Sequence, residues 1–276
     1  MKEEMDNLKQ SILDNYPRLA KTDKFLFACH QDVPCFNDCC GDVNIFLTPY
    51  DIIRLKNHLG ITSGEFLQKY TVSPFDKKQK YPVVILKMQD NEKKNCFFVT
   101  AKGCSVYPDR PWSCRMYPLG LASPKEGSTR EDEFYFLMKE DVCRGFQEKK
   151  EQTITEWLDD QGINLYDEMG RLYKELTLHD FFERGGELSP EKMEMFHVVC
   201  YNIDKFREFL LQSTFLQKFN IAEDVIEKIK TDDVELFKFG CNWLKFSLYG
   251  EKTMTVKEAV LAEKKTEMNN RSTPRG

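Results

Sequence analysis

The sequence predicts an α+β protein, in which an irregular, cysteine-rich domain with a small antiparallel sheet and helices precedes an all-helical C-terminal region. Three observations lead to this prediction. Eight of the ten cysteines lie between residues 29 and 143. Two apolar runs in the same region, 81–88 and 96–100, have the composition of strands. After residue 151, apolar residues recur at helical spacing.

The composition changes along the chain and predicts four segments. An N-terminal lead-in helix, the cysteine-rich domain, a helical region and a flexible tail are expected at 1–22, 23–150, 151–250 and 251–276. Pro17 would end the lead-in helix. The last segment is charged and polar, which is typical of a mobile terminus. With 276 residues, 41% of them hydrophobic, the chain can bury a core without metals or disulfides.

Helix boundaries are predicted from capping residues. Thr48 has the position of an N-cap, Pro49 follows at the first helical position, and Gly60 would end that helix. Thr153 and Glu156 have the spacing of a capping box. Further apolar repeats predict helices near 63–70, 165–176, 190–199, 206–211, 225–229 and 234–248.

The strands are expected to form one small sheet. Residues 81–88 and 96–100 would pair as a hairpin around a turn at 90–92, and 133–138 could add a third strand. The segment 103–120 is rich in proline and aromatic residues, so it is expected to be a loop.

Charge and hydropathy exclude some classes of function. The chain has 40 basic and 45 acidic residues, a net charge of −5, and no block of consecutive Lys or Arg, so we expect no nucleic-acid partner. The N-terminus lacks the pattern of a signal peptide. No apolar run approaches the roughly 18 residues of a membrane span. We therefore expect a cytoplasmic protein without a membrane partner, and in that compartment clustered cysteines indicate metal before disulfides.

Eight cysteines are the candidate metal ligands. They are Cys29, Cys35, Cys39, Cys40, Cys96, Cys104, Cys114 and Cys143. Zinc and iron–sulfur clusters each commonly take four thiolates, so eight ligands match two sites. In an extended backbone, adjacent side chains point to opposite sides, so Cys39 and Cys40 would serve different centres. Cys200 and Cys241 fall on apolar helical patterns and are expected in the core.

Residues around the thiolates could tune such a site. Tyr107, Arg110 and Arg115 are interleaved with Cys104 and Cys114, and arginines there could offset negative charge and donate hydrogen bonds to sulfur. Ordinary surface ion pairs are the alternative interpretation of both arginines. The cysteine spacings match neither paired zinc knuckles nor a ferredoxin run, so they predict a site assembled from distant pieces of chain.

Four motifs together resemble the bacterial YkgJ-type cysteine-cluster family, which is described as chelating zinc or iron. They are Cys35-x-x-x-Cys39-Cys40, Leu47-Thr48-x-x-Asp51, Cys96-Phe-Phe, and Cys104-x-x-Tyr-x-x-Arg110-Pro111-x-x-Cys114-Arg115-x-Tyr-Pro118. The resemblance covers about residues 25–147 and implies that these cysteines bind metal or iron–sulfur clusters. The interval from Cys29 to Cys35 is wider than is usual in the family.

Several functions remain open at this point. The first is a protein that holds 4Fe–4S clusters for electron transfer or redox sensing, with a protein redox partner; zinc or mononuclear iron is the alternative. A related family branch implies an S-adenosylmethionine-dependent enzyme that methylates lysines of a protein substrate. Asp51 and Asp109 could then be acid/base groups, or simply a first-turn helix residue and a turn residue. A disulfide between Cys39 and Cys40 is a further alternative.

Overall fold

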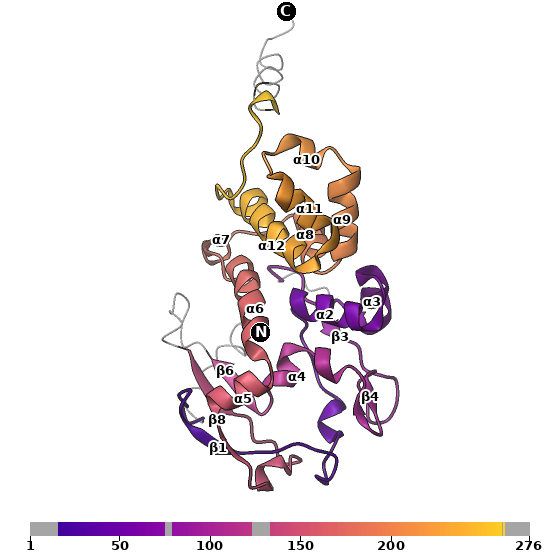
Figure 1. Cartoon of the computed structure of the whole chain (residues 1–276), viewed down its shortest axis with the longest axis vertical. Helices are drawn as coiled ribbons and strands as arrows, with labels where there is room; N and C mark the ends of the chain where they lie inside the picture. The colour runs from indigo at the N-terminus through magenta and orange to yellow at the C-terminus, as the bar shows by residue number, and fades with distance from the viewer. Residues whose placement is uncertain (1–15, 75–78, 123–132, 261, 263–276) are drawn as a thin grey trace, which may run out of the picture. The chain divides into compact units, whose positions relative to one another are not determined.

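The computed structural model describes residues 16–74, 79–122, 133–260 and 262 (Figure 1). The fold is α+β, with helices and short two-stranded antiparallel sheets. The chain divides into two compact units, of which the first comprises Met1–Asp51 and Ile85–Met169 and the second Ile52–Val84 and Gly170–Gly276. In the described ranges, every helix is too short or too polar to cross a lipid bilayer.

The first unit consists of short elements joined by turns. Its strands are β1 (Lys24–Leu26), β3 (Ile85–Leu86), β4 (Val99–Thr100), β5 (Gly103–Cys104), β6 (Leu119–Ala122), β7 (Phe134–Leu137) and β8 (Glu151–Thr153). Its helical elements are η1 (Asp38–Cys40), η2 (Tyr107–Asp109), α4 (Trp112–Met116), η4 (Gly145–Gln147), α5 (Ile154–Asp160) and the first part of α6 (Ile163–Thr177).

The core of the first unit forms around Trp157 of α5. The Trp157 ring meets the Phe27 ring edge-on, with ring centroids 5.5 Å apart, and its indole N–H donates to the Met116 carbonyl at 3.3 Å. β1 pairs antiparallel with β8, so both ends of the cysteine-rich segment meet in one sheet. The buried cluster consists of Phe25, Phe27, Met116, Leu119, Tyr135, Ile154, Trp157, Leu158 and Ile163.

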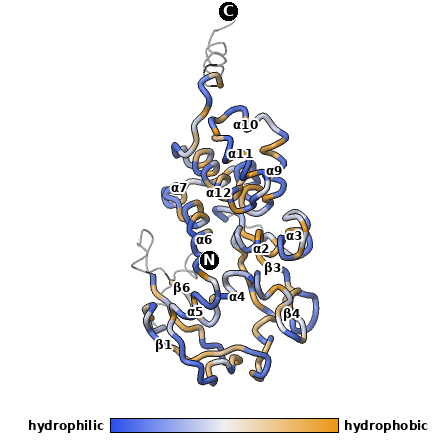
Figure 2. The backbone as a smooth tube through the Cα atoms, in the orientation of Figure 1, coloured by the Kyte–Doolittle hydropathy of each residue, from blue (hydrophilic) through white to orange (hydrophobic). Residues whose placement is uncertain are grey.

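The second unit is helical. It contains most of α2 (Pro49–Leu59), α3 (Ser63–Tyr70), strand β2 (Thr71–Val72), the end of α6, α7 (Asp180–Glu183), α8 (Pro190–Cys200), α9 (Ile203–Gln212), α10 (Phe215–Lys218), α11 (Glu223–Thr231), α12 (Asp233–Leu244) and the π-helix η5 (Lys245–Tyr249). Helices α8, α9, α11 and α12 pack side by side (Figure 1). Hydrophobic and hydrophilic stretches alternate along them (Figure 2), and Phe196, Phe206 and Phe237 are fully buried.

The predicted helix boundaries that depend on local capping are confirmed. The Thr48 hydroxyl accepts the Asp51 amide at 3.2 Å at the start of α2, and Gly60 follows its end with φ of 64°. Thr153 and Glu156 form the predicted capping box of α5. Cys200 and Cys241 are both buried in the helical unit, as expected from their apolar helical patterns.

The predicted strand pairing is largely wrong. The hairpin between 81–88 and 96–100 is reduced to a single bridge from Met88 to Cys96, and β4 pairs with β5 instead. β7 pairs with β6, which lies partly inside the predicted loop 103–120. Gly120 lies opposite Phe136 in this pairing, and a Cβ atom there would lie 2.2 Å from the Phe136 ring, so the glycine leaves room for the ring where it lies.

The compact units do not follow the predicted boundary near residue 150. Helix α5 packs in the core of the first unit, while residues 52–84 belong to the second. Residues 255–257 pair with the backbone of 218–220, so the beginning of the predicted tail is an ordered part of the helical unit. Residues 261 and 263–276 of that tail and residues 1–15 of the lead-in helix lie outside the described residues.

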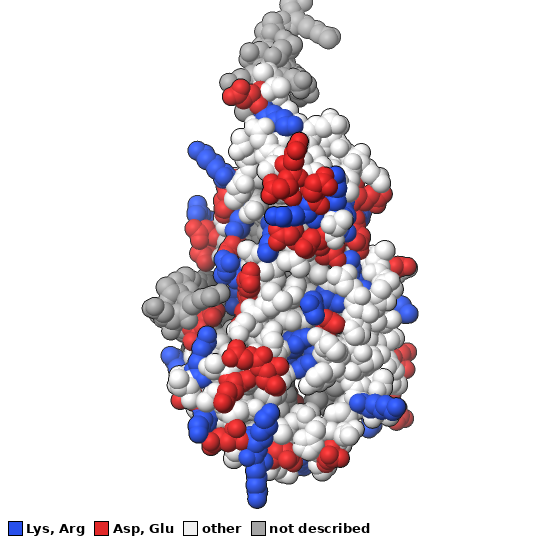
Figure 3. All heavy atoms as spheres, viewed as in Figure 1, with Lys and Arg blue, Asp and Glu red and all other residues white. Residues whose placement is uncertain are grey.

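Acidic and basic side chains are interspersed on the face that Figure 3 shows. Both signs alternate there over short distances, as is typical of a protein with 40 basic and 45 acidic residues. The expectation that the chain has no nucleic-acid partner stays a prediction.

Candidate metal centres

One set of four cysteines lines a single narrow cavity of the first unit. The cavity measures about 30 Å³, and Phe27 and Val33 contribute apolar walls. Its cysteines are Cys29, Cys35, Cys39 and Cys143. The pKa of the Cys29 thiol is raised to about 11, first by its partial removal from water and then by the charges of the other three cysteines. The four thiols therefore lie within electrostatic range of one another, although Cys143 is more than a hundred residues from Cys29.

The other four cysteines form a second set. They are Cys40, Cys96, Cys104 and Cys114. The Cys96 amide donates to the Cys40 carbonyl at 2.7 Å, and Cys104 lies in β5 beside β4. The pKa of Cys114 is raised to about 12, first because surrounding atoms displace water from its thiol and then by the charges of Cys96, Asp51 and Cys104. Cys114 and Cys96 also raise the pKa of Cys40.

Cys39 and Cys40 connect the two sets. The adjacent residues lie in the 3-10 turn η1, not in the extended backbone from which their divergence was predicted. Their thiols hydrogen-bond each other: this bond lowers the pKa of Cys39 to about 7 and raises that of Cys40. The two adjacent thiols therefore ionise as a pair at the contact between the sets, with Cys39 losing its proton first.

Backbone amides donate hydrogen bonds to several of the sulfur atoms. The Arg144 amide is 3.1 Å from the Cys35 Sγ, and the Phe98 amide is 3.5 Å from the Cys96 Sγ. The Val106 amide acts likewise on Cys104 and lowers its pKa, against the larger effect of burial, which raises it. Such bonds stabilise the thiolate, which is the form that binds metal.

The two arginines are buried, so the alternative of surface ion pairs is wrong. Arg110 donates to the Tyr107 carbonyl at 2.7 Å and to the Gln161 side chain, and its guanidinium lies 3.7 Å above the Tyr107 ring. Arg115 donates to the Arg110 and Gln161 carbonyls at 3.0 and 2.7 Å and to the Pro108 carbonyl. These bonds go to oxygen rather than to sulfur.

Arg110 nevertheless acts on the cysteines through its charge. It lowers the pKa of Cys29, Cys104 and Cys114, in each case as a smaller effect than the desolvation that raises it. The arginine thus favours the thiolate form in both sets from a position fixed by the Tyr107 carbonyl and the Gln161 side chain.

Comparison with known proteins agrees with this grouping of cysteines in one segment. Residues 28–158 match the family model CxxCxxCC, described as "Putative zinc- or iron-chelating domain". The matched segment, residues 28–158, is called the CxxCxxCC domain below. The match confirms the predicted resemblance to a cysteine-cluster family, and it contains every cysteine of the two sets. Comparison with curated proteins and with solved structures finds no similar protein.

The CxxCxxCC domain also contains two residues whose contacts sequence reasoning missed. Burial raises the pKa of the Tyr117 hydroxyl, and the nearby Cys143 adds to this rise. The Asp51 carboxylate, fully buried, accepts the Trp112 amide at 2.8 Å at the start of the helix that carries Cys114. Both residues stand in the motifs quoted above, but their partners are distant in sequence.

The donor chemistry of the CxxCxxCC domain fits a metal that prefers sulfur. Eight thiols, amide donors to sulfur and a buried cation favour zinc or iron over magnesium or calcium, which prefer oxygen. Within the described ranges, no three His, Cys, Asp or Glu side chains are already placed to hold a metal ion. Side chains of each set would therefore have to rotate toward a common point when a metal binds.

Proposed function

We propose that the CxxCxxCC domain binds two 4Fe–4S clusters, one in each set of four cysteines, and that the protein has a redox function. The observation that carries the proposal is the division of eight thiols into four and four, with the adjacent Cys39 and Cys40 in different sets. Four thiolates are the usual complement of such a cluster. Several of the ligands lie in turns or at strand ends, where side chains can rotate.

The surroundings of both sets support a redox function over purely structural zinc. Hydrogen bonds to sulfur and nearby charges are the main means by which proteins set the potential of an iron–sulfur cluster. The amides of Arg144 and Phe98 supply such bonds, and Arg110 supplies positive charge to both sets. Its burial keeps this charge from being screened by salt.

Anaerobically purified protein is expected to contain iron and acid-labile sulfide in equal amounts, about eight of each per chain. It should be brown, with broad absorption in the visible range that bleaches on reduction. Metal and sulfide analysis with spectroscopy measures this directly. Colourless protein with about two zinc ions per chain and no sulfide would instead establish the zinc alternative.

Serine substitutions should separate the two sets. Cys35→Ser and Cys104→Ser are each expected to lose about half of the bound metal, because each removes a ligand from one set only. Cys241→Ser is the matched control, since this thiol is buried in the helical unit, and it should keep the full metal content. Complete loss of metal from either variant would contradict the division into two sets.

The S-adenosylmethionine-dependent alternative stays a prediction, as do the cytoplasmic location and the protein redox partner. Calorimetric titration of the metal-loaded protein with S-adenosylmethionine tests the alternative. Saturable binding would favour a methyl-transferring enzyme. No heat of binding at millimolar S-adenosylmethionine would contradict this alternative and retain the redox proposal.

A further inference from the structure

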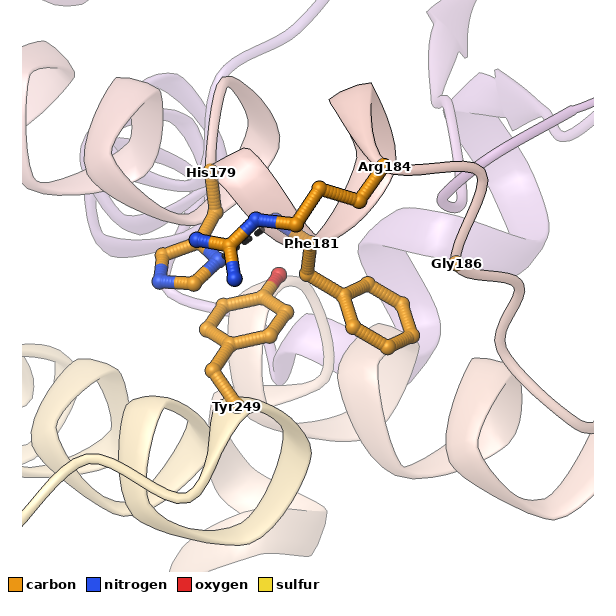
Figure 4. Close-up of a pocket in the computed structure, with 5 residues that line it drawn as sticks. All are labelled: His179, Phe181, Arg184, Gly186 and Tyr249. Carbon is orange, nitrogen blue, oxygen red and sulfur yellow. Dashed lines mark hydrogen bonds between the residues drawn. The ribbon is translucent and has the colours of Figure 1, made fainter.

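A second candidate site lies in the helical unit, where the end of η5 meets α7 and the turn after it (Figure 4). It is an open cavity of about 250 Å³. Its lining residues are His179, Phe181, Arg184, Gly186 and Tyr249. Three aromatic rings and one guanidinium thus surround a space that is slightly smaller than a typical drug-sized pocket, which indicates a single-ring ligand.

Two of the rings form a fixed flat wall. The His179 and Tyr249 rings stack with centroids 3.9 Å apart at an angle of 7°. His179 Nδ1 accepts the Phe181 amide at 3.0 Å, so the ring proton is on Nε2, which faces Glu251 Oε1 at 3.0 Å. The Tyr249 hydroxyl donates to the Leu176 carbonyl at 2.7 Å. Because these rings are already held, a ligand would not have to order them.

Phe181 provides a second aromatic surface. Its ring lies 5.5 Å from the Tyr249 ring and is tilted by 42° to it, so the two rings converge on the cavity (Figure 4). Aromatic rings prefer offset or tilted contacts with one another at this range of distances. The lining therefore suits a flat aromatic ring better than a saturated one.

The guanidinium of Arg184 gives the cavity its charge preference. Arg184 Nη2 is 2.9 Å from Asp180 Oδ2, and both side chains are largely exposed, at 76% and 66%. An exposed pair of this kind is weak, so another carboxylate can compete for or share the guanidinium. Arg184 is the charged residue of the lining, and Glu251 is engaged by His179, so a cationic ligand is disfavoured.

We propose that this cavity binds a single-ring aromatic carboxylate, with its ring against Phe181 and Tyr249 and its carboxylate on Arg184. Guanidinium and carboxylate match as two planar groups with paired donors and acceptors. The flat walls select the ring and the guanidinium selects the anion. The site uses none of the cysteines, so it does not depend on the proposed function.

Calorimetric titration of the full chain with benzoate tests the proposal. One benzoate is expected to bind per chain, with a dissociation constant below about 20 mM. Cyclohexanecarboxylate, which has the charge without the flat ring, and benzyl alcohol, which has the ring without the charge, should each bind at least about fivefold more weakly.

Substitutions place the binding in this cavity. Arg184→Gln and Phe181→Leu should each weaken benzoate binding by about fivefold or more. Arg171→Gln is the matched control, because Arg171 makes a similar helical pair with Glu175 at 2.8 Å outside the lining. No saturable binding of benzoate, or equal affinity in the Arg184 and Arg171 variants, would overturn the proposal.

Discussion

Replacement of Lys56 with methionine is expected to lower the free energy of unfolding of the helical unit by about 3–5 kcal/mol. The Lys56 ammonium is buried, 2.8 Å from Asp233 and 3.3 Å from Asp204. Arg207 binds the same two carboxylates. Removal of the lysine would leave two partly buried anions with a single cation. Urea unfolding followed by circular dichroism measures the change.

Two further variants test the origin of this effect. Lys230→Met removes an exposed pair with Glu227 and should change stability by less than about 0.5 kcal/mol. Adding Asp233→Asn to Lys56→Met restores the balance of charge and should recover at least about 1 kcal/mol. The outcome that contradicts this is an Asp233→Asn substitution that lowers the free energy of unfolding of Lys56→Met by as much as it lowers that of the native protein. The loss on replacing Lys56 would then come from packing and not from an unpaired charge.

The same cluster should make the helical unit sensitive to acid. Burial opposes ionisation of Asp233, but hydrogen bonds from Arg207 and Lys56 outweigh it and lower its pKa below 3.8. The folded state therefore binds this proton less tightly than the unfolded state does. Its contribution to stability is present above about pH 4 and is lost as the pH falls through the lower, folded-state pKa. Acid titration followed by circular dichroism should show a smaller loss in Asp233→Asn.

Features that depend on neighbouring residues could be predicted from the sequence. The ends of α2 and α5 follow from capping bonds between residues three apart, such as Thr153 and Glu156, and these form whatever the helix packs against. The cysteine-rich segment could be located for a similar reason, since its density of thiols exceeds any need of packing. The assignment of Cys200 and Cys241 to the core followed from helical periodicity.

Features that depend on distant contacts could not be predicted. The pairing of β7 with β6 places Phe136 over Gly120, a contact between distant residues that no local pattern reveals. The capping box identified α5 as a helix but not the unit in which its apolar face would be buried. The separation of Cys39 from Cys40 was predicted from an extended backbone, whereas η1 is a 3-10 turn. The sequence left the arginines as donors to sulfur or as members of surface ion pairs, whereas both are buried and donate to backbone carbonyls and to the Gln161 side chain.

The stability difference between the native protein and Asp51→Asn is expected to depend on pH. Asp51 is fully buried, and burial raises the pKa of its carboxyl from 3.8 to about 6, although hydrogen bonds from Thr48 and Trp112 act in the opposite direction. The folded state therefore binds a proton more tightly than the unfolded state, and stability falls as the pH rises from about 4 to about 6. The shift corresponds to a loss on the order of 3 kcal/mol.

Urea unfolding of both proteins across this pH range measures the dependence. The asparagine side chain of the variant would remain neutral and would keep an oxygen for the Trp112 amide. The dependence of its stability on pH therefore lacks the titration of Asp51 but contains the titrations of all other groups. The native protein should lose stability relative to Asp51→Asn as the pH rises from about 4 to about 7. A constant difference would show that the Asp51 carboxyl titrates at the same pH in the folded and unfolded states.

Asp51→Ala should in addition weaken metal retention at the second set of cysteines. The carboxylate accepts the Thr48 amide at 2.7 Å and the Trp112 amide at 2.8 Å, and alanine would leave both donors unsatisfied, at about 1–3 kcal/mol each. Trp112 begins the short helix that carries Cys114, so its loss of anchorage would loosen one ligand of one centre. Chelator should then extract about half of the metal faster than from Asp51→Asn, in which the Trp112 contact is kept. Equal acceleration of the whole metal content would mean that Asp51 supports the entire unit, and no acceleration would mean that Cys114 is held by other contacts.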